Sequence, residues 1–319
     1  MSVSESQSTS HTHSPERVSV CIATCQRPVG LGNLLAALEV LDIPAGYAFQ
    51  VVIVDNEPSG SARAVCDEAA ARHAYPIHYM VEKNRGIPFA RNAALAVALT
   101  NSDFVAFIDD DETPRSDWLS ELLRVQKFYK ADVVTGPCIP QYLEPPPSWV
   151  VEGGFHELPR YPTGTRRHAA YTHNVLVRTA VFESVDHYFD ESMALNGGDD
   201  TEFFSRAYSE GFQIVWADNA IVHERIPASR STVGWLVRRG FRVGTSSAWV
   251  QLNHRSSTVL HLLAHGLYCM VKGTGLALLL PLRGRAVAVR GLRLFSYGLG
   301  RIAGSSGYLH QEYGVVHGT

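Results

Sequence analysis

Four carboxylates follow one another in the stretch FVAFIDDDETP, residues 104–114, directly after an apolar run. The side chains of Asp109, Asp110, Asp111 and Glu112 repel one another, and like charges a few ångström apart raise each other's pKa. Either solvent screens these charges in an exposed turn, or a cation neutralises them in a divalent-metal site at the end of a sheet strand. A run of Asp alone does not separate the two interpretations, so other parts of the chain must decide.

A second acidic cluster lies in the stretch LNGGDDTEFF, residues 195–204. Asp199, Asp200 and Glu202 gather at the start of a predicted amphipathic helix, where the helix dipole favours anions. Helix capping explains an acid at this position, but it does not require two adjacent acids behind two glycines. Further along the chain a predicted strand ends in IVHE, so that His223 is a reasonable third metal ligand beside the two acidic clusters.

Apolar runs and helical patterns alternate through the first half of the chain. We expect strands at residues 18–24, 49–56, 77–81, 103–110 and 131–136, and helices at 31–41, 61–74, 86–99 and 116–129. Near-continuous Val and Ile runs separated by helices predict an α/β fold with a mostly parallel sheet covered on both faces.

Polar side chains follow three of these strands. Thr24 comes after the first strand, Asp55 after the second, and the acidic residues 109–112 after the fourth. In open parallel sheets ligands bind beyond the carboxyl ends of the strands, so we expect these groups along one edge of one cleft. Residues 137–169 hold seven prolines and little periodicity, which predicts a long loop over that cleft, either ordered or mobile.

The composition is that of a globular protein, with 45% hydrophobic and 18% charged residues in 319. From residue 255 to the end there are seven Lys or Arg and one acid, a charge of +6, so the net charge of −3 leaves −9 for residues 1–254.

The five cysteines form no paired CxxC units, which favours reduced thiols in a cytosolic setting. Residues 1–16 lack an apolar core and are interpreted as a flexible leader.

Seven segments occur in the order and spacing of a known family: VSVCIATCQRP, VVIVDNEPSG, NRGIPFARN, FVAFIDDDE, HNVLVR, GGDDTEFF and IVHERIP. Over residues 17–250 the chain resembles family 2 glycosyltransferases, and within them the bacterial exopolysaccharide branch of succinoglycan-type glucosyltransferases. The resemblance implies a GT-A fold, Rossmann-like with a mostly parallel central sheet and followed here by C-terminal apolar and basic helices. It also implies inverting transfer of one sugar from a nucleotide sugar, a UDP-hexose, with Mg²⁺ or Mn²⁺.

The resemblance assigns the donor site position by position. Thr24 and Asp55 would hold the uridine, and Arg91 would lie near the phosphates of the donor. Asp109 and Asp110 belong to the same donor-binding set. A leaving nucleotide diphosphate develops negative charge, which a hard cation with oxygen ligands neutralises.

The resemblance likewise assigns the metal ligands and the base. Asp111 would be the direct metal ligand of a DxD-type pair with Asp109, and His223 would bind the metal or the diphosphate. Asp200 would be the catalytic base that takes the proton of the acceptor hydroxyl. Asp199 competes for that role, because the family usually has Glu-Asp where this chain has Asp-Asp.

Several alternatives remain at this stage. The family's processive Gln-x-x-Arg-Trp element is absent, and GWLVRRGFRVG at 234–244 occupies its region, which favours single-sugar transfer. Arg238 or Arg239 would face a diphosphate or an anionic acceptor, or would belong to an exposed basic helix face.

A nucleotide-sugar pyrophosphorylase would need a Gly-rich loop that TCQRPVGLG matches poorly, and no G-x-G-x-x-G supports a dehydrogenase. A non-catalytic sugar-nucleotide-binding or scaffold protein is the alternative outside enzymes.

The C-terminal region differs in character from the rest. Residues 258–281 are apolar but interrupted by two histidines and a lysine, which is poor for a membrane span. The next residues, 282–304, space arginines among apolar side chains, which favours a segment lying in a membrane interface over simple packing on the catalytic body.

We therefore expect three parts: the leader 1–16, a catalytic domain at 17–254, and a helical membrane-associating region at 255–319. The resemblance adds a lipid-linked saccharide acceptor and thus peripheral or interfacial association with the cytoplasmic face of the bacterial inner membrane. Besides a UDP-sugar, this acceptor and the membrane surface, we expect no nucleic-acid partner.

Overall fold

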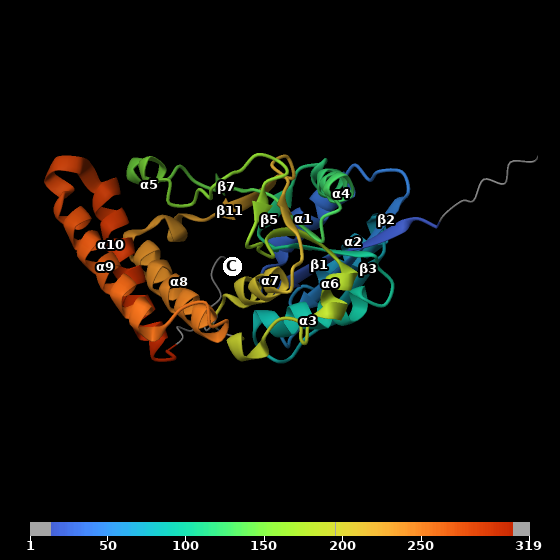
Figure 1. Ribbon diagram of the computed structural model, residues 1–319. Helices are drawn as coiled ribbons and strands as arrows, with labels where there is room; N and C mark the ends of the chain where they lie inside the picture. The colour runs from blue at the N-terminus through green and yellow to red at the C-terminus, as the bar shows by residue number, and fades with distance from the viewer. Residues whose placement is uncertain (1–13, 195, 309–319) are drawn as a thin grey trace, which may run out of the picture.

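The computed structural model describes residues 14–194 and 196–308. A large mixed sheet forms the centre of the main body of the molecule (Figure 1). Its strand order is β3 (Ile77–Val81), β2 (Tyr47–Asp55), β1 (Glu16–Thr24), β4 (Phe104–Ile108), β9 (Asn174–Arg178), β6 (Val133–Thr135), β10 (Ile214–Trp216) and β8 (Arg166–Arg167). Strands β3, β2, β1 and β4 run parallel to one another, whereas β9 runs antiparallel to both β4 and β6.

Both faces of the sheet are buried, which explains why its first strands have continuous apolar runs. In β1 and β2 alternate residues enter different cores: Val20 and Ile53 face one, and Cys21 and Val52 face the other. Helices α1 (Pro28–Glu39), α2 (Arg63–Arg72) and α4 (Trp118–Tyr129) cover the first face. Helices α3 (Ile87–Ala98), α6 (Thr179–Ser184) and α7 (Asp199–Ser209) cover the second.

A small second sheet extends the body toward its C-terminal helices. Its order is β5 (Glu112–Pro114), β11 (Val222–Ile226) and β7 (Cys138–Tyr142), with β11 in the centre. Residues 137–169, predicted as one long loop, contain β7, the short helix α5 (Ser148–Gly153) and β8. The ordered form of the predicted loop is thus what the structure shows. Its short elements were not predicted, because strands of two to five residues leave no readable alternation in a proline-rich sequence.

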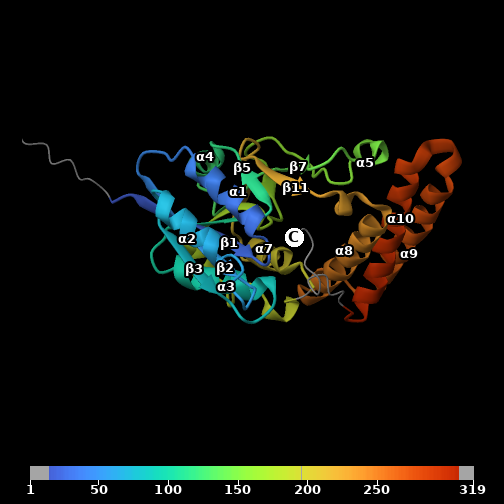
Figure 2. The same cartoon turned by 180° about the vertical axis from the view of Figure 1, so that it is seen from behind.

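Three long helices form a layer at one end of the molecule, which we call the helical arm: α8 (Val233–Asn253), α9 (Val259–Leu278) and α10 (Leu280–Ser305) (Figures 1 and 2). Helix α10 packs against both α8 and α9. Small residues permit this close approach: a methyl group added at Gly266 of α9 would lie 2.8 Å from the carbonyl oxygen of Gly298 in α10.

The position of α10 bears on the predicted membrane-associating region. Many small residues of the segment 282–304, such as Ala286, Ala288 and Gly298, are buried, while Leu282, Leu292 and Leu299 are exposed. Membrane association of this segment stays a prediction. No helix in the described part of the chain is long and apolar enough to cross a membrane. Most of the predicted leader falls outside the described residues, and β1 already begins at Glu16.

The packing of α9 on α10 yields a test with an internal control. We expect Gly266→Ala to lower the free energy of unfolding by about 1–3 kcal/mol, because its methyl group overpacks the helix contact. Gly275 lies on the same helix with nothing within 4 Å of an added methyl group. Gly275→Ala should therefore be neutral or stabilising by up to about 1 kcal/mol. Urea unfolding measures both, and equal destabilisation would contradict the described packing.

Candidate active site

The acidic residues 109–112 form a turn between β4 and β5, which we call the acidic turn. Asp110 is buried and accepts hydrogen bonds from the Thr24 hydroxyl at 2.8 Å and from Arg27 Nη1 at 2.9 Å. Glu112 folds back and accepts a hydrogen bond from the backbone N–H of Asp109 at 2.9 Å. Burial raises the pKa of Asp110 to about 6 and the pKa of Glu112 well above its ordinary value.

Guanidinium groups neutralise much of this negative charge. Asp111 Oδ2 accepts hydrogen bonds from Arg27 Nη1 at 3.2 Å and from Arg230 Nη2 at 3.0 Å. Arg230 also donates to Glu224 of β11 at 2.8 Å, so it joins the acidic turn to the small sheet. The exposed, solvent-screened turn is thus not what the structure shows, because the carboxylates of Asp110 and Asp111 bind arginines from distant parts of the chain.

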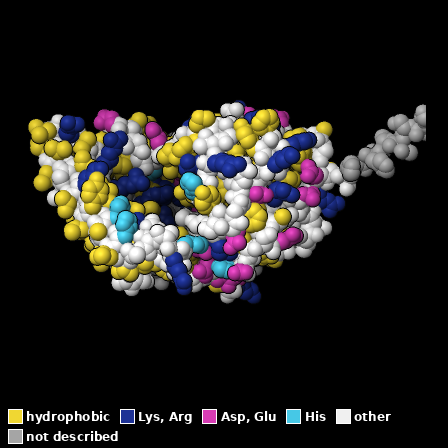
Figure 3. Space-filling model, in the orientation of Figure 1, with side chains coloured by type: hydrophobic (Ala, Val, Ile, Leu, Met, Phe, Trp, Pro, Cys, Tyr) yellow, Lys and Arg dark blue, Asp and Glu magenta, His cyan; other side chains and the backbone are white. Residues whose placement is uncertain are grey.

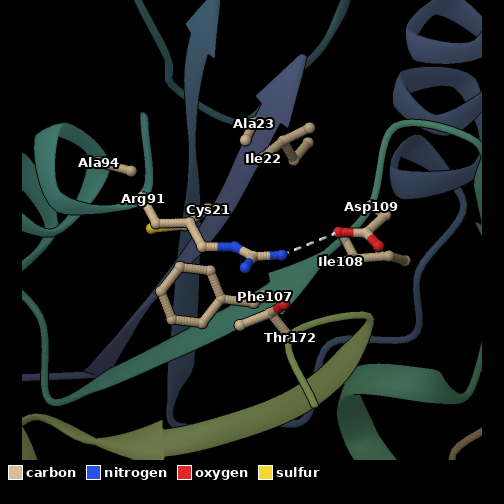
Figure 4. A pocket seen from close by; sticks show the side chains of 9 residues that line it. All are labelled: Cys21, Ile22, Ala23, Arg91, Ala94, Phe107, Ile108, Asp109 and Thr172. Carbon is tan, nitrogen blue, oxygen red and sulfur yellow. Dashed lines mark ion pairs between the residues drawn. The ribbon is translucent and has the colours of Figure 1, made fainter. Parts of the chain in front are cut away.

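Arg91 joins the two acidic clusters. It lies on α3 with only 6% of its surface exposed, and its Nη1 donates to Asp199 Oδ2 at 2.6 Å. Its Nη2 lies 3.7 Å from Asp109 Oδ1 (Figure 4). Desolvation raises the pKa of the buried Asp199 and of the Asp109 carboxyl, which is still partly exposed, and the charge of Arg91 counteracts that rise. Arg91, predicted near the donor phosphates, therefore pairs with carboxylates in this structure, and contact with a donor stays a prediction.

The adjacent residues Asp199 and Asp200 have different surroundings. Gly198 adopts a φ of 101° before α7, a conformation that favours glycine, and turns the chain into the helix. Asp199 is 2% exposed and engaged by Arg91. Asp200 is partly exposed, and only its Oδ1 accepts hydrogen bonds from described residues, both from Thr201. Asp200 is therefore the acid of the second cluster that keeps an oxygen available.

His173 is within electrostatic range of acids from both clusters, although the sequence analysis gave it no role. It precedes β9 in the HNVLVR segment, and its ring stacks on Tyr171 with centroids 5.5 Å apart. Burial lowers the pKa of His173 to about 4, while Asp200 and Asp111 act to raise it and Arg239 and Arg91 lower it further. The imidazole is thus neutral at neutral pH.

Thr24 and Asp55 lie at the ends of adjacent strands, as expected, where they form a register pair. Both are buried. Asp55 accepts hydrogen bonds from the N–H groups of Glu57 and Ala62 and from the hydroxyl of Tyr79, at 2.8–3.1 Å. These contacts fix the loop after β2, and the binding of uridine by Thr24 and Asp55 stays a prediction.

His223 lies in β11, in register with Thr113 of β5 and one position before Glu224. Strand alternation turns His223 to the opposite face from Glu224, which contacts Arg230. Within the described residues no group of three or more His, Cys, Asp or Glu side chains is placed to hold a metal ion. The predicted ligand set Asp109, Asp111 and His223 is therefore not gathered at one point here and stays a prediction.

Comparison with known proteins identifies the family. The chain matches the family model Glycosyl transferase family 2 over residues 19–186. The succinoglycan biosynthesis protein ExoM of Rhizobium meliloti is 33% identical over 228 residues, which cover 71% of this chain and 72% of that protein. The chain belongs to the family 2 glycosyltransferases and is a transferase. This assignment rules against the pyrophosphorylase and dehydrogenase alternatives.

A more distant relative and a solved structure extend the comparison. The glucosyl-dolichyl phosphate glucuronosyltransferase of Haloferax volcanii is 27% identical over 188 residues, 54% of this chain and 58% of that protein. The solved structure of S. aureus TarS 1-349 in complex with UDP-GlcNAc superposes with a TM-score of 0.54 at 18% identity, covering 91% of this chain and 92% of that one. The predicted GT-A fold is thereby confirmed.

The buried bridge of Arg91 makes a stability prediction. Removing its charge in Arg91→Met leaves Asp199 buried without its partner, so we expect a loss of about 3–5 kcal/mol in the free energy of unfolding. Arg72 pairs with Glu68 on the exposed surface of α2. Arg72→Met should cost less than about 0.5 kcal/mol. Urea unfolding compares the two variants, and losses of similar size would show that Arg91 is not a buried structural bridge.

Proposed function

We propose that this chain transfers one hexose from a UDP-sugar to a lipid-linked saccharide acceptor, with inversion at the anomeric carbon and in the presence of Mg²⁺ or Mn²⁺. The setting would be bacterial exopolysaccharide synthesis at the cytoplasmic face of the inner membrane. The name of ExoM as a succinoglycan biosynthesis protein supports the pathway class. The TarS complexes with UDP and UDP-GlcNAc support the donor class, since they share the fold of this chain.

The mechanism rests on one observation, which is that Asp199 and Asp200 have different hydrogen-bond partners. Asp199 is held by Arg91, which leaves Asp200 as the carboxylate with an oxygen open to a ligand. We assign the base to Asp200: it takes the proton from the acceptor hydroxyl while that oxygen attacks the anomeric carbon. The bond to UDP breaks on the opposite face and its electron pair leaves with the diphosphate, so the configuration inverts.

The acidic turn suits a hard cation by its chemistry. The Asp109 and Asp111 side chains are 40% and 20% exposed, and Mg²⁺ is commonly held by one or two carboxylates together with substrate phosphates. A three-residue protein cluster is not required for such a site. Asp111 and Asp109 would hold the ion, with His223 as the further candidate ligand. Bound there, the ion would supply neutralisation of the leaving diphosphate.

The catalytic role of Asp200 can be tested by UDP release from a panel of UDP-sugars in the presence of bacterial membrane extract. We expect Asp200→Asn to reduce turnover about 100- to 10,000-fold while the affinity for the UDP-sugar is retained, because only proton transfer is lost. EDTA should abolish the signal in the wild type, and Asp111→Ala should do the same.

A matched control is Asp67→Asn, which removes an exposed carboxylate on α2. It should leave UDP release at the wild-type rate. If Asp200→Asn also turns over at that rate, Asp200 is not the base. If the wild type binds a donor but releases no UDP with membrane extract, a non-catalytic sugar-nucleotide-binding protein is the correct interpretation.

Membrane association is supported by the outer face of α9. Exposed apolar side chains recur on it at helical spacing, with exposed fractions of 77% for Leu260, 58% for Leu267, 67% for Val271 and 74% for Leu278. An exposed apolar stripe of this length marks an interaction surface. Since helices without acidic residues carry it, we assign it to an anionic bilayer surface, as part of the membrane-associating region proposed for residues 255–319.

We expect the double variant Leu267→Asn and Val271→Asn to reduce binding to vesicles that contain anionic phospholipid at least tenfold, because two of the most exposed apolar contacts are lost. Phe128→Asn is the control, since Phe128 is 74% exposed on α4 of the catalytic body. Vesicle co-flotation measures both. Flotation of the double variant at the level of the Phe128 variant would contradict the assignment of α9.

A further inference from the structure

A hollow separate from the acidic site lies where the helical arm meets the catalytic body. Its volume is about 340 Å³, and its walls come from α8, α10 and the end of α5. Arg290, Arg293 and Tyr297 of α10 line it together with Phe155 and Val243. In the space-filling view Lys and Arg side chains gather in the depression between the arm and the body (Figure 3).

The two lining arginines are anchored by the backbone of the segment that follows α5. Arg290 donates through Nε and Nη2 to the carbonyl oxygen of Gly153 at 3.1 and 2.9 Å, and Arg293 Nη1 donates to that of Phe155 at 3.3 Å. These bonds fix the position of each guanidinium group but use only part of its five N–H donors. The acceptors are neutral carbonyl groups, so these bonds do not themselves compensate either positive charge.

The three helices of the arm supply no negative charge to the hollow. The sequence contains no Asp or Glu between Glu224 and Glu312, so none of the three helices of the arm carries an acid. Helix α5 carries one acid, the exposed Glu152, and Arg290 Nη2 donates to its backbone carbonyl oxygen at 3.3 Å. Burial lowers the pKa of Arg293. Burial also lowers the pKa of the neighbouring Arg239 to about 10, and the charges of Arg242, Arg230 and Arg293 add to that decrease. A bound anion would relieve this repulsion between partly buried guanidinium groups.

The rest of the lining is apolar or aromatic. Phe155, Val243, Leu294 and the ring of Tyr297 stand beside the two arginines. Guanidinium groups bind phosphate oxygens with two parallel hydrogen bonds, which makes arginine the preferred partner of phosphate. The combination of fixed arginines and apolar walls fits a phosphate group attached to a hydrophobic moiety.

The hollow lies close to the acidic site without sharing its residues. Arg239 precedes Gly240, which lines the hollow, and its ring neighbour is Trp235, with the guanidinium carbon 5.1 Å from the ring centroid. The charge of Arg239 also acts on the pKa of His173 and of Glu224 in the acidic site. Arg239 of α8 thus adjoins a lining residue of the hollow and acts electrostatically on the acidic site, so α8 connects the two.

We propose that this hollow binds the phosphate-bearing head of an amphiphilic ligand, with Arg290 and Arg293 as its anion contacts. The inference rests on the proposed function in one respect, because it identifies that ligand with the lipid-linked acceptor. The phosphate ester linking the saccharide to its lipid is the group held here, and the saccharide reaches toward Asp200.

The test uses the full chain with saturating UDP and EDTA, which block the donor site and remove divalent ions. Farnesyl diphosphate is the probe for a lipid-borne phosphate, and inorganic pyrophosphate is the probe for a free one. Val243 is 39% exposed and lines the hollow. Val243→Glu places a negative charge beside the arginines, and Val243→Gln is its uncharged control of equal size.

We expect calorimetric titration to show that Val243→Glu weakens farnesyl diphosphate binding at least tenfold, while Val243→Gln stays within twofold of wild type. Pyrophosphate bound at least tenfold more weakly than farnesyl diphosphate supports the lipid source, and equal affinity supports an anion site for free phosphate. Binding that is absent for both probes, or equal in the two variants, overturns the proposal.

UDP affinity of the Glu variant, measured separately, shows that it folds. UDP release from UDP-sugars tests the transferase function independently of the hollow, so the proposed function and the proposed binding site can each fail without the other.

Discussion

The pairing of buried carboxylates with arginines is the interaction on which the active-site region depends. Asp110, Asp111 and Asp199 each bind a guanidinium group, and Arg91 connects the turn after β4 to the start of α7. Without these cations the acids would have to take up protons or leave the interior, because ionised carboxylates are costly to bury. The same pairs therefore set both the local fold and the charge that any ligand meets.

The central architecture could be predicted from sequence because its signals are local. Strands such as residues 18–24 and 49–56 are apolar on both faces, and short turns bound them, so their class and order follow from the pattern alone. The antiparallel strand β9 and the three-stranded sheet were not predictable in this way. Strands as short as ETP at 112–114, or as polar as VHERI at 222–226, acquire their structure from partners far along the chain.

The candidate site was predicted in its positions but not in its pairings. The sequence showed acids directly after predicted strands and behind two glycines. It did not show that Arg27 and Arg230 contact Asp111, because 84 and 119 residues separate these partners and sequence spacing predicts no contact over such distances. The different burial of Asp199 and Asp200 follows from helix geometry, since adjacent residues on a helix point in different directions. His173 belongs to the HNVLVR segment, but only the structure shows that it is desolvated near charged groups of the site.

The position of Arg230 limits where the helical arm could be exchanged for that of another protein. It lies in the short 3₁₀ turn Ala228–Ser231, between β11 and the first residue of α8, and it holds both Asp111 and Glu224. The helical arm is thus joined covalently, within a few residues, to a side chain that neutralises the acidic turn. An arm exchanged between relatives would have to bring its own β11 and its own Arg230. The boundary for a functional chimaera therefore lies upstream of β11 and not at the visible junction of body and arm.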